Sequence, residues 1–198
     1  MVQQTVTLLE SVLEANHRFT RPGAFPPLPK SPTRQLAIFT CMDTRLVDFL
    51  EPAMGLKRGD AKVIKNAGNT IIDPNGGVIR SLVVGVFFLG VEEIFVIGHR
   101  DCGMSDVNDA MLRHRMIERG IEADAIDALI PDMHSWLGAF THPVENIKHV
   151  VKIIRDCPLI PEDIPVHGLL FCPDDGHLDL LENGYNRQTF SNEANQKY

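Results

Sequence analysis

The sequence lacks a long hydrophobic run and an excess of positive charge. No stretch of the 198 residues approaches the ~18 uninterrupted apolar residues that a membrane span requires. Lys and Arg number 19 against 26 Asp and Glu, which gives a net charge of -7 and a pI near 5.6. These features argue against a membrane protein and against a nucleic-acid or anionic-membrane partner, which would favour a basic surface.

Cysteine is also scarce, and the four cysteines are widely spaced along the chain. They are Cys41, Cys102, Cys157 and Cys172. A chain of this length with 44% hydrophobic residues can bury a sizeable core and needs no disulfide staples. The N-terminus has no basic region, long apolar stretch or small-residue cleavage site typical of a secretory signal. We therefore expect a cytoplasmic protein whose cysteines are reduced, and we interpret Cys157 and Cys172 as buried small apolar residues.

The alternation of apolar patterns predicts a single α/β domain over residues 1–198. Short runs rich in β-branched and aromatic residues predict buried strands at 35–40, 61–66, 92–98 and 166–172. Helical patterns occupy 46–55, 76–89, a long stretch at 104–139, and 143–155. This alternation predicts a mostly parallel central sheet of order 2-1-3-4, flanked by helices. The segment 177–182 follows a turn signal and could add an antiparallel edge strand.

The two ends of the chain have patterns of their own. Residues 2–18 have the spacing of an amphipathic helix, and the Pro-rich stretch 21–32 breaks that spacing, so 1–33 is interpreted as an N-terminal helix and an extended arm. The tail 184–198 is polar and aperiodic, which predicts a segment that is loosely held or docked on a partner subunit.

Two motifs place reactive side chains directly after predicted strands. Cys41 and Asp43 project to the same side of an extended segment, and Arg45 joins them if the extension persists. After the third strand, His99 and Cys102 stand three residues apart, a spacing that suits chelation of one ion. With the order 2-1-3-4, the carboxyl ends of these two strands flank the crevice where α/β proteins bind ligands.

Two thiolates and one imidazole at that crevice predict a zinc site. Cys41, His99 and Cys102 would supply three fixed ligands and leave open the fourth position that distinguishes catalytic from structural zinc. Zinc lowers the pKa of bound water from ~15.7 to about 7, which generates hydroxide near neutral pH. Asp43, held by Arg45, could accept a hydrogen bond from that water and fix its orientation.

The pattern C-x-D-x-R followed by H-x-x-C-G resembles the β-class carbonic anhydrases, in their compact prokaryotic branch. The likeness extends over residues 34–182, and it includes 59–69, 77–90, 92–104 and 158–171. The resemblance implies that Cys41, His99 and Cys102 ligate one zinc ion per chain and that Asp43 and Arg45 form the catalytic pair. It also implies reversible hydration of carbon dioxide to bicarbonate and a proton. A homodimer or homotetramer is implied as well, with the N-terminal helix and arm packed on the neighbour.

Three further residues are candidates for substrate binding. Gly103 opens the segment after Cys102, where backbone N–H groups could hold bicarbonate. Asn66 and Gly68 follow a strand end, and they either line the crevice or form a tight turn that needs a positive φ. A departure from the family is Arg100, where Thr is usual; this cation could pair with Asp101, bind bicarbonate or point to solvent.

Other functions are compatible with parts of this pattern. Relatives with the same five residues hydrolyse carbonyl sulfide or carbon disulfide, and they differ in access to the site. A non-catalytic zinc or interaction protein would have Asp43 permanently in the fourth position. A cysteine phosphatase is disfavoured, because its Cys and Arg stand further apart around a phosphate-binding loop than Cys41 and Arg45 do. Whether Asp43 pairs with Arg45 or ligates zinc is left open by the sequence.

Overall fold

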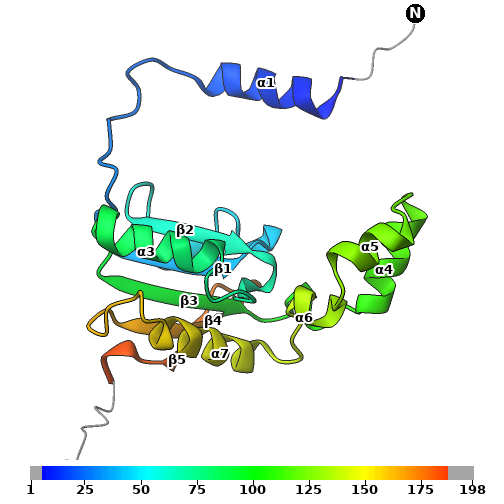
Figure 1. Cartoon of the computed structure of the whole chain (residues 1–198). Coiled ribbons are helices and arrows are strands. Elements are labelled where there is room, and N and C mark those ends of the chain that lie inside the picture. The colour runs from blue at the N-terminus through cyan, green and yellow to red at the C-terminus, as the bar shows by residue number, and fades with distance from the viewer. Residues whose placement is uncertain (1–5, 187–198) are drawn as a thin grey trace, which may run out of the picture.

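The computed structural model, which describes residues 6–186, contains one five-stranded sheet of order β2-β1-β3-β4-β5 (Figure 1). The strands are β1 (Leu36–Cys41), β2 (Ala61–Asn66), β3 (Glu93–His99), β4 (Val166–Phe171) and β5 (Leu178–Glu182). The first four are parallel, and β5 pairs with β4 in the antiparallel sense. The predicted mostly parallel α/β fold with its antiparallel edge strand is confirmed.

The order of the strands brings the ends of β1 and β3 together. β1 is buried at all six positions, as its continuous apolar run predicts for a strand covered on both faces. It lies between β2 and β3, with Cys41 opposite Asn66 on one side and Thr40 opposite Ile97 on the other. Because β1 and β3 are parallel neighbours, the segments that follow Cys41 and His99 leave the sheet at the same edge.

Helices cover both faces of the sheet unequally. The described helices are α1 (Leu8–Phe19), α2 (Leu50–Ala53), α3 (Gly77–Leu89), α4 (Asp109–Glu118), α5 (Ala123–Leu129), α6 (Met133–Leu137) and α7 (Pro143–Asp156), of which α2, α3 and α7 cover the sheet. The long helices α3 and α7 enclose the larger core, which includes Phe39, Leu82 and Ile147. The short α2 and the turn before it cover the opposite face, where Leu50 packs near Phe171.

Two of the predicted helical stretches are wrong in extent. The stretch 104–139 is three short helices, because Gly120 adopts φ 89° after α4, Pro131 interrupts the chain after α5, and Gly138 adopts φ 58° after α6. The stretch 46–55 contains only the four-residue α2. In Figure 1, α4 and α5 extend away from the sheet.

The N-terminal helix stands apart from the rest of the molecule. α1 begins at Thr7, whose hydroxyl accepts from the backbone N–H of Glu10 while the Glu10 carboxylate caps Thr7 in return. None of its residues is buried, and Figure 1 shows it separated from the sheet by an extended segment. The first residues of the predicted helix, 2–5, lie outside the described part of the chain.

At the other end of the chain, Gly184–Asn186 form a single turn after β5. The backbone N–H of Gly184 donates to Nδ1 of His167 at 3.1 Å. The remainder of the predicted tail, 187–198, lies outside the described residues. Within residues 6–186, no helix is long and apolar enough to cross a membrane.

Candidate metal site

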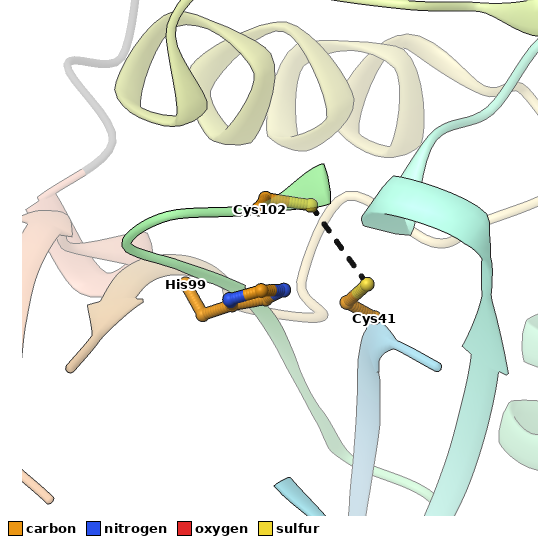
Figure 2. A group of neighbouring side chains, drawn as sticks. All are labelled: Cys41, His99 and Cys102. Carbon is orange, nitrogen blue, oxygen red and sulfur yellow. Dashed lines mark hydrogen bonds between the residues drawn. The ribbon is translucent and has the colours of Figure 1, made fainter. Parts of the chain in front are cut away.

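Cys41, His99 and Cys102 meet at the carboxyl edge of the sheet (Figure 2). Cys41 and His99 are the last residues of β1 and β3, and Cys102 follows in the turn after β3. One ligand atom from each of the three lies within 4.8 Å of the others, and the two sulfur atoms are 3.9 Å apart. All three side chains are buried, with exposed fractions of 4%, 1% and 2%.

The arrangement of these three side chains fits a zinc ion. Nε2 of His99 is buried and has no hydrogen-bond partner among residues 6–186, which is costly for a polar atom unless a ligand satisfies it. Nδ1 of the same ring lies 2.9 Å from the Arg100 carbonyl oxygen, a contact that fixes the ring and leaves Nε2 free to coordinate. Two thiolates and one imidazole are a donor set that suits Zn²⁺.

The pKa values of the two cysteines are driven apart. The pKa of Cys41 is well below that of a free thiol, first because the Cys102 thiol donates a hydrogen bond to it and then because the His99 side chain and backbone groups of Asp43 and Gly68 stabilise the thiolate against the cost of burial. The same sulfur contact, with burial, raises the pKa of Cys102. Without a metal, the two buried sulfurs share one proton, and a divalent cation would take the place of that proton.

Asp43 and Arg45 form a pair beside the three ligand candidates. The chain does not stay extended to Arg45, because Asp43 caps a single turn over Thr44–Leu46. Arg45 instead returns to Asp43 through two side-chain hydrogen bonds, from Nε at 3.0 Å and from Nη2 at 2.9 Å. These bonds hold the pKa of Asp43 at about 2. Oδ2 of Asp43 lies 3.7 Å from Nε2 of His99, so the carboxylate lies at the edge of the ligand cluster.

Arg45 also connects the two loops that carry the ligand candidates. Its Nη1 donates to Oδ2 of Asp101 at 2.8 Å, and its Nη2 donates to the Asp101 carbonyl at 2.6 Å. Asp101 has φ 52°, a conformation that few residues other than glycine adopt. The sequence suggested Asp101 only as a partner of Arg100 and missed this contact, because the contact depends on the turn of the chain at Asp43.

A pocket of about 430 Å³ opens over the metal-binding cluster. Cys41, Asp43, Arg45 and Cys102 all line it. The remaining lining residues are Met42, Thr44, Ala67, Gly68, Gly103 and Met104. The mouth of this pocket is the place where a small substrate could approach the metal.

The predicted substrate-binding residues differ in where they lie. Gly68 and Gly103 line the pocket, and Gly68 has φ 70°, as a tight turn requires. The side chain of Asn66 instead bonds to the backbone of Thr70. Its Nδ2 donates to the Thr70 carbonyl oxygen at 2.8 Å, and its Oδ1 accepts from the Thr70 N–H at 3.2 Å. Its amide therefore serves to close the turn.

Arg100 does not pair with Asp101, and its side chain reaches toward solvent, as one of the alternatives from the sequence has it. Its Nη2 donates to Oδ2 of Asp179 on β5 at 2.7 Å, and the side chain is 57% exposed. Asp179 also lies 3.2 Å from Nε2 of His177. The cation at position 100 therefore joins the loop after β3 to the edge strand and lies outside the pocket.

Three candidate metal ligands at the carboxyl edge of an open α/β sheet, with a carboxylate bonded to an arginine beside them, are typical of proteins that present a bound metal to a small molecule. The sequence profile of the carbonic anhydrases matches residues 36–178. The chain belongs to this family, in its β class.

Individual relatives agree in fold and length. The Bacillus subtilis protein YvdA is 41% identical over 191 residues, which cover 94% of this chain and 97% of YvdA. The crystal structure of β-carbonic anhydrase isoform I from Trichomonas vaginalis has a TM-score of 0.86 at 43% identity, covering 90% of this chain and 100% of that one. A carbon disulfide hydrolase from Acidithiobacillus thiooxidans is 31% identical over 156 residues, which cover 73% of this chain and 76% of that enzyme.

Proposed function

We propose that this protein is a zinc-dependent carbonic anhydrase that catalyses the reversible hydration of carbon dioxide to bicarbonate and a proton. The observation that carries the proposal is the convergence of Cys41, His99 and Cys102 beneath a pocket whose wall includes Asp43. Family membership narrows the chemistry of that site to the carbonic anhydrase reaction and its close variants.

Cys41, His99 and Cys102 would hold one zinc ion per chain. When bound there, zinc supplies the Lewis acidity that ionises water near neutral pH. The low pKa of Cys41 favours the thiolate that a metal requires, whereas the raised pKa of Cys102 means that zinc binding would have to displace the Cys102 proton.

Asp43 and Arg45 would orient the attacking water. With Arg45 occupying both of its oxygens, the Asp43 carboxylate remains ionised and is kept at the edge of the ligand cluster. A carboxylate in this state accepts a hydrogen bond from water and cannot donate one, which fixes the direction of the water lone pair toward the substrate. The contact between Asp43 and Arg45 supports the form of the site in which Asp43 does not ligate zinc and the fourth position is left to water.

The glycine-lined wall would bind the substrate. Gly68 and Gly103 border the pocket with backbone only, which leaves room for carbon dioxide. Asn66 would contribute by shaping the turn that carries Gly68.

The direct test is stopped-flow hydration of carbon dioxide at about pH 8, on protein whose zinc content has been quantified. The control is Cys102→Ala, which removes one ligand candidate. Turnover that follows zinc content and disappears in the control would establish the reaction. Bound zinc without any turnover between pH 6 and 9 would contradict it and favour a non-catalytic zinc or interaction protein.

Hydrolysis of carbonyl sulfide or carbon disulfide is the second candidate. It is favoured by the likeness to a carbon disulfide hydrolase, at 31% identity. The same zinc-loaded sample distinguishes the two: release of hydrogen sulfide from either compound, with no hydration of carbon dioxide, would select the hydrolase.

The protein would act as a homodimer or homotetramer in the cytoplasm. The support is α1, whose apolar residues face solvent in a single chain: Leu8 is 82% exposed, Leu9 67% and Leu13 59%. A contiguous exposed apolar face of this kind marks a surface that another chain covers. All four cysteines are free, which agrees with a reducing compartment.

A further inference from the structure

Asn146 is a polar residue on the face of α7 that packs against the sheet. Its exposed fraction is 7%, and the neighbouring Ile147 and Val150 are fully buried. Burial of an amide costs free energy unless its polar atoms find partners. The Nδ2 atom of Asn146 donates to the carbonyl oxygen of Gly68 at 3.0 Å, a buried bond between residues 78 positions apart.

Gly68 is the middle residue of the turn Ala67–Asn69, which forms one wall of the metal pocket. A Cβ atom at Gly68 would lie 2.8 Å from Cγ of Met104 and 2.9 Å from Cε1 of Phe140, so the turn has no free space on that side. Asn66, the residue before the turn, lies opposite Cys41 in the sheet, and its carbonyl oxygen accepts from the backbone N–H of Met42 at 2.9 Å. A shift of this turn would therefore change the position of the Cys41 sulfur.

The other hydrogen bonds of the turn lie mostly within the turn itself. Asn66 and Thr70 bond to each other, and Oγ1 of Thr70 donates to the Ala67 carbonyl at 3.2 Å. These bonds set the shape of the turn. The bond from Asn146 ties that shape to α7, which belongs to the main core of the molecule.

We propose that Asn146 is a positioning residue of the metal site, which holds the Ala67–Asn69 turn in place beside the end of β1 and thereby positions the Cys41 sulfur. The proposal rests on the proposed function in one respect, the assignment of Cys41 as a zinc ligand. Partners outside the ligands commonly control metal affinity by fixing the direction of the ligand atom.

The test replaces Asn146 by Leu, whose side chain has the same number of heavy atoms and the same branch point but no donor, in the full chain. Zinc is replaced by cobalt(II), and the visible and near-ultraviolet absorption bands that report sulfur–cobalt bonding are recorded. These bands respond to the geometry of the ligands. Zinc affinity is measured by competition with a chelator. We expect shifted cobalt bands and a zinc affinity about tenfold lower, at the small end of the range for such outer partners.

Ile154→Ala is the matched control, because Ile154 is fully buried on the same face of α7, two turns further along. It lowers the melting temperature through loss of packing, and its cobalt bands and zinc affinity should equal those of the wild type. Thr70→Val removes the bond to Ala67 and should shift the cobalt bands in the same direction as Asn146→Leu, by less. If Asn146→Leu does not fold, Asn146→Ser takes its place.

Cobalt bands and zinc affinity of wild-type character in the Asn146 variant would overturn the proposal, as would an equal shift in Ile154→Ala. These outcomes are distinct from a failure of the proposed function. A wild-type protein that binds no zinc contradicts both, whereas a zinc-loaded, active wild type with an unaffected Asn146 variant contradicts the positioning role alone.

Discussion

The carboxyl edge of the sheet and the helix α1 are both incomplete within one chain, for opposite reasons. At the edge, His99 is buried and its Nε2 lacks a hydrogen-bond partner in the described part of the chain. On α1, Leu8 and Leu13 are more than half exposed. A buried polar atom is stabilised by an ion, and an exposed apolar side chain is stabilised by another protein surface. The two regions therefore indicate two different partners, a metal and a second chain.

The largest effect should come from removal of a ligand candidate. His99→Ala deprives the site of its imidazole, and we expect loss of bound zinc and a fall in carbon dioxide hydration of about 10³-fold or more, since metal catalysis supplies several kcal/mol. Stopped-flow rates and zinc content measure this effect. The oligomer should be unchanged by gel filtration; dissociation of His99→Ala would show that the two regions depend on each other.

The reciprocal change is made on α1. Leu9→Asp with Leu13→Asp places charge on the exposed apolar face, and we expect dissociation to monomers with a dissociation constant raised by at least about 100-fold, because each buried leucine contributes roughly 1.5–3 kcal/mol. Analytical ultracentrifugation measures the shift. Zinc content should be retained. A variant that remains associated like the wild type would remove α1 from the interface.

Asp43→Asn separates catalysis from metal binding within the site. We expect zinc to remain bound while kcat falls about 10²-fold, because the amide can donate to water in the wrong direction, and positioned acid–base groups contribute roughly 10²–10⁴-fold. With its pKa at about 2, Asp43 stays ionised from pH 5 upward, so the wild-type profile between pH 6 and 9 should not reflect its titration. An Asp43→Asn enzyme of wild-type rate would exclude the orienting role.

A smaller effect on stability is expected from His167, at the end of the sheet opposite the metal site. Burial lowers the pKa of His167, against the opposing influence of Glu93 and with a further lowering from Arg155. The folded state therefore favours the neutral ring, whose Nδ1 accepts from Gly184. Stability from this group is complete above the usual pKa of about 6.5 and is lost as the pH falls below it.

His167→Gln keeps a hydrogen-bond acceptor and a donor, but the glutamine amide does not bind a proton in this pH range. Melting temperatures from pH 7.5 to 5 should therefore fall less in this variant than in the wild type, and the difference in free energy of unfolding should approach roughly 1 kcal/mol per pH unit over part of that range. Parallel curves for the two proteins would show that His167 does not titrate with unfolding.

The smallest effect is expected at Arg100. Its ion pair with Asp179 is exposed, and such pairs contribute ~0–1 kcal/mol. Arg100→Thr should therefore change kcat/KM by less than about twofold and leave zinc binding intact. A larger loss of hydration rate would mean that the link to β5 controls the loop between His99 and Cys102.

Most of the sheet could be predicted from the sequence, because a parallel strand buried on both faces needs an uninterrupted apolar run such as Leu36–Cys41. The stretch 104–139 could not be predicted as well. Its apolar spacing favoured continuous helix, while Gly120 and Pro131 broke it at the positions where the structure ends α4 and α5. Local breakers prevailed there because the segment has few buried contacts to compensate for them.

The residue types of the site were set by the sequence itself, since Cys41, His99 and Cys102 follow strand ends that parallel pairing must bring to one edge. Only the tertiary structure decided the partners of those residues. The return of Arg45 to Asp43 depends on a turn, and the bond from Asn146 to Gly68 joins residues 78 positions apart. Strand and ligand patterns are local and can be read along the chain, whereas such contacts exist only after the core has packed.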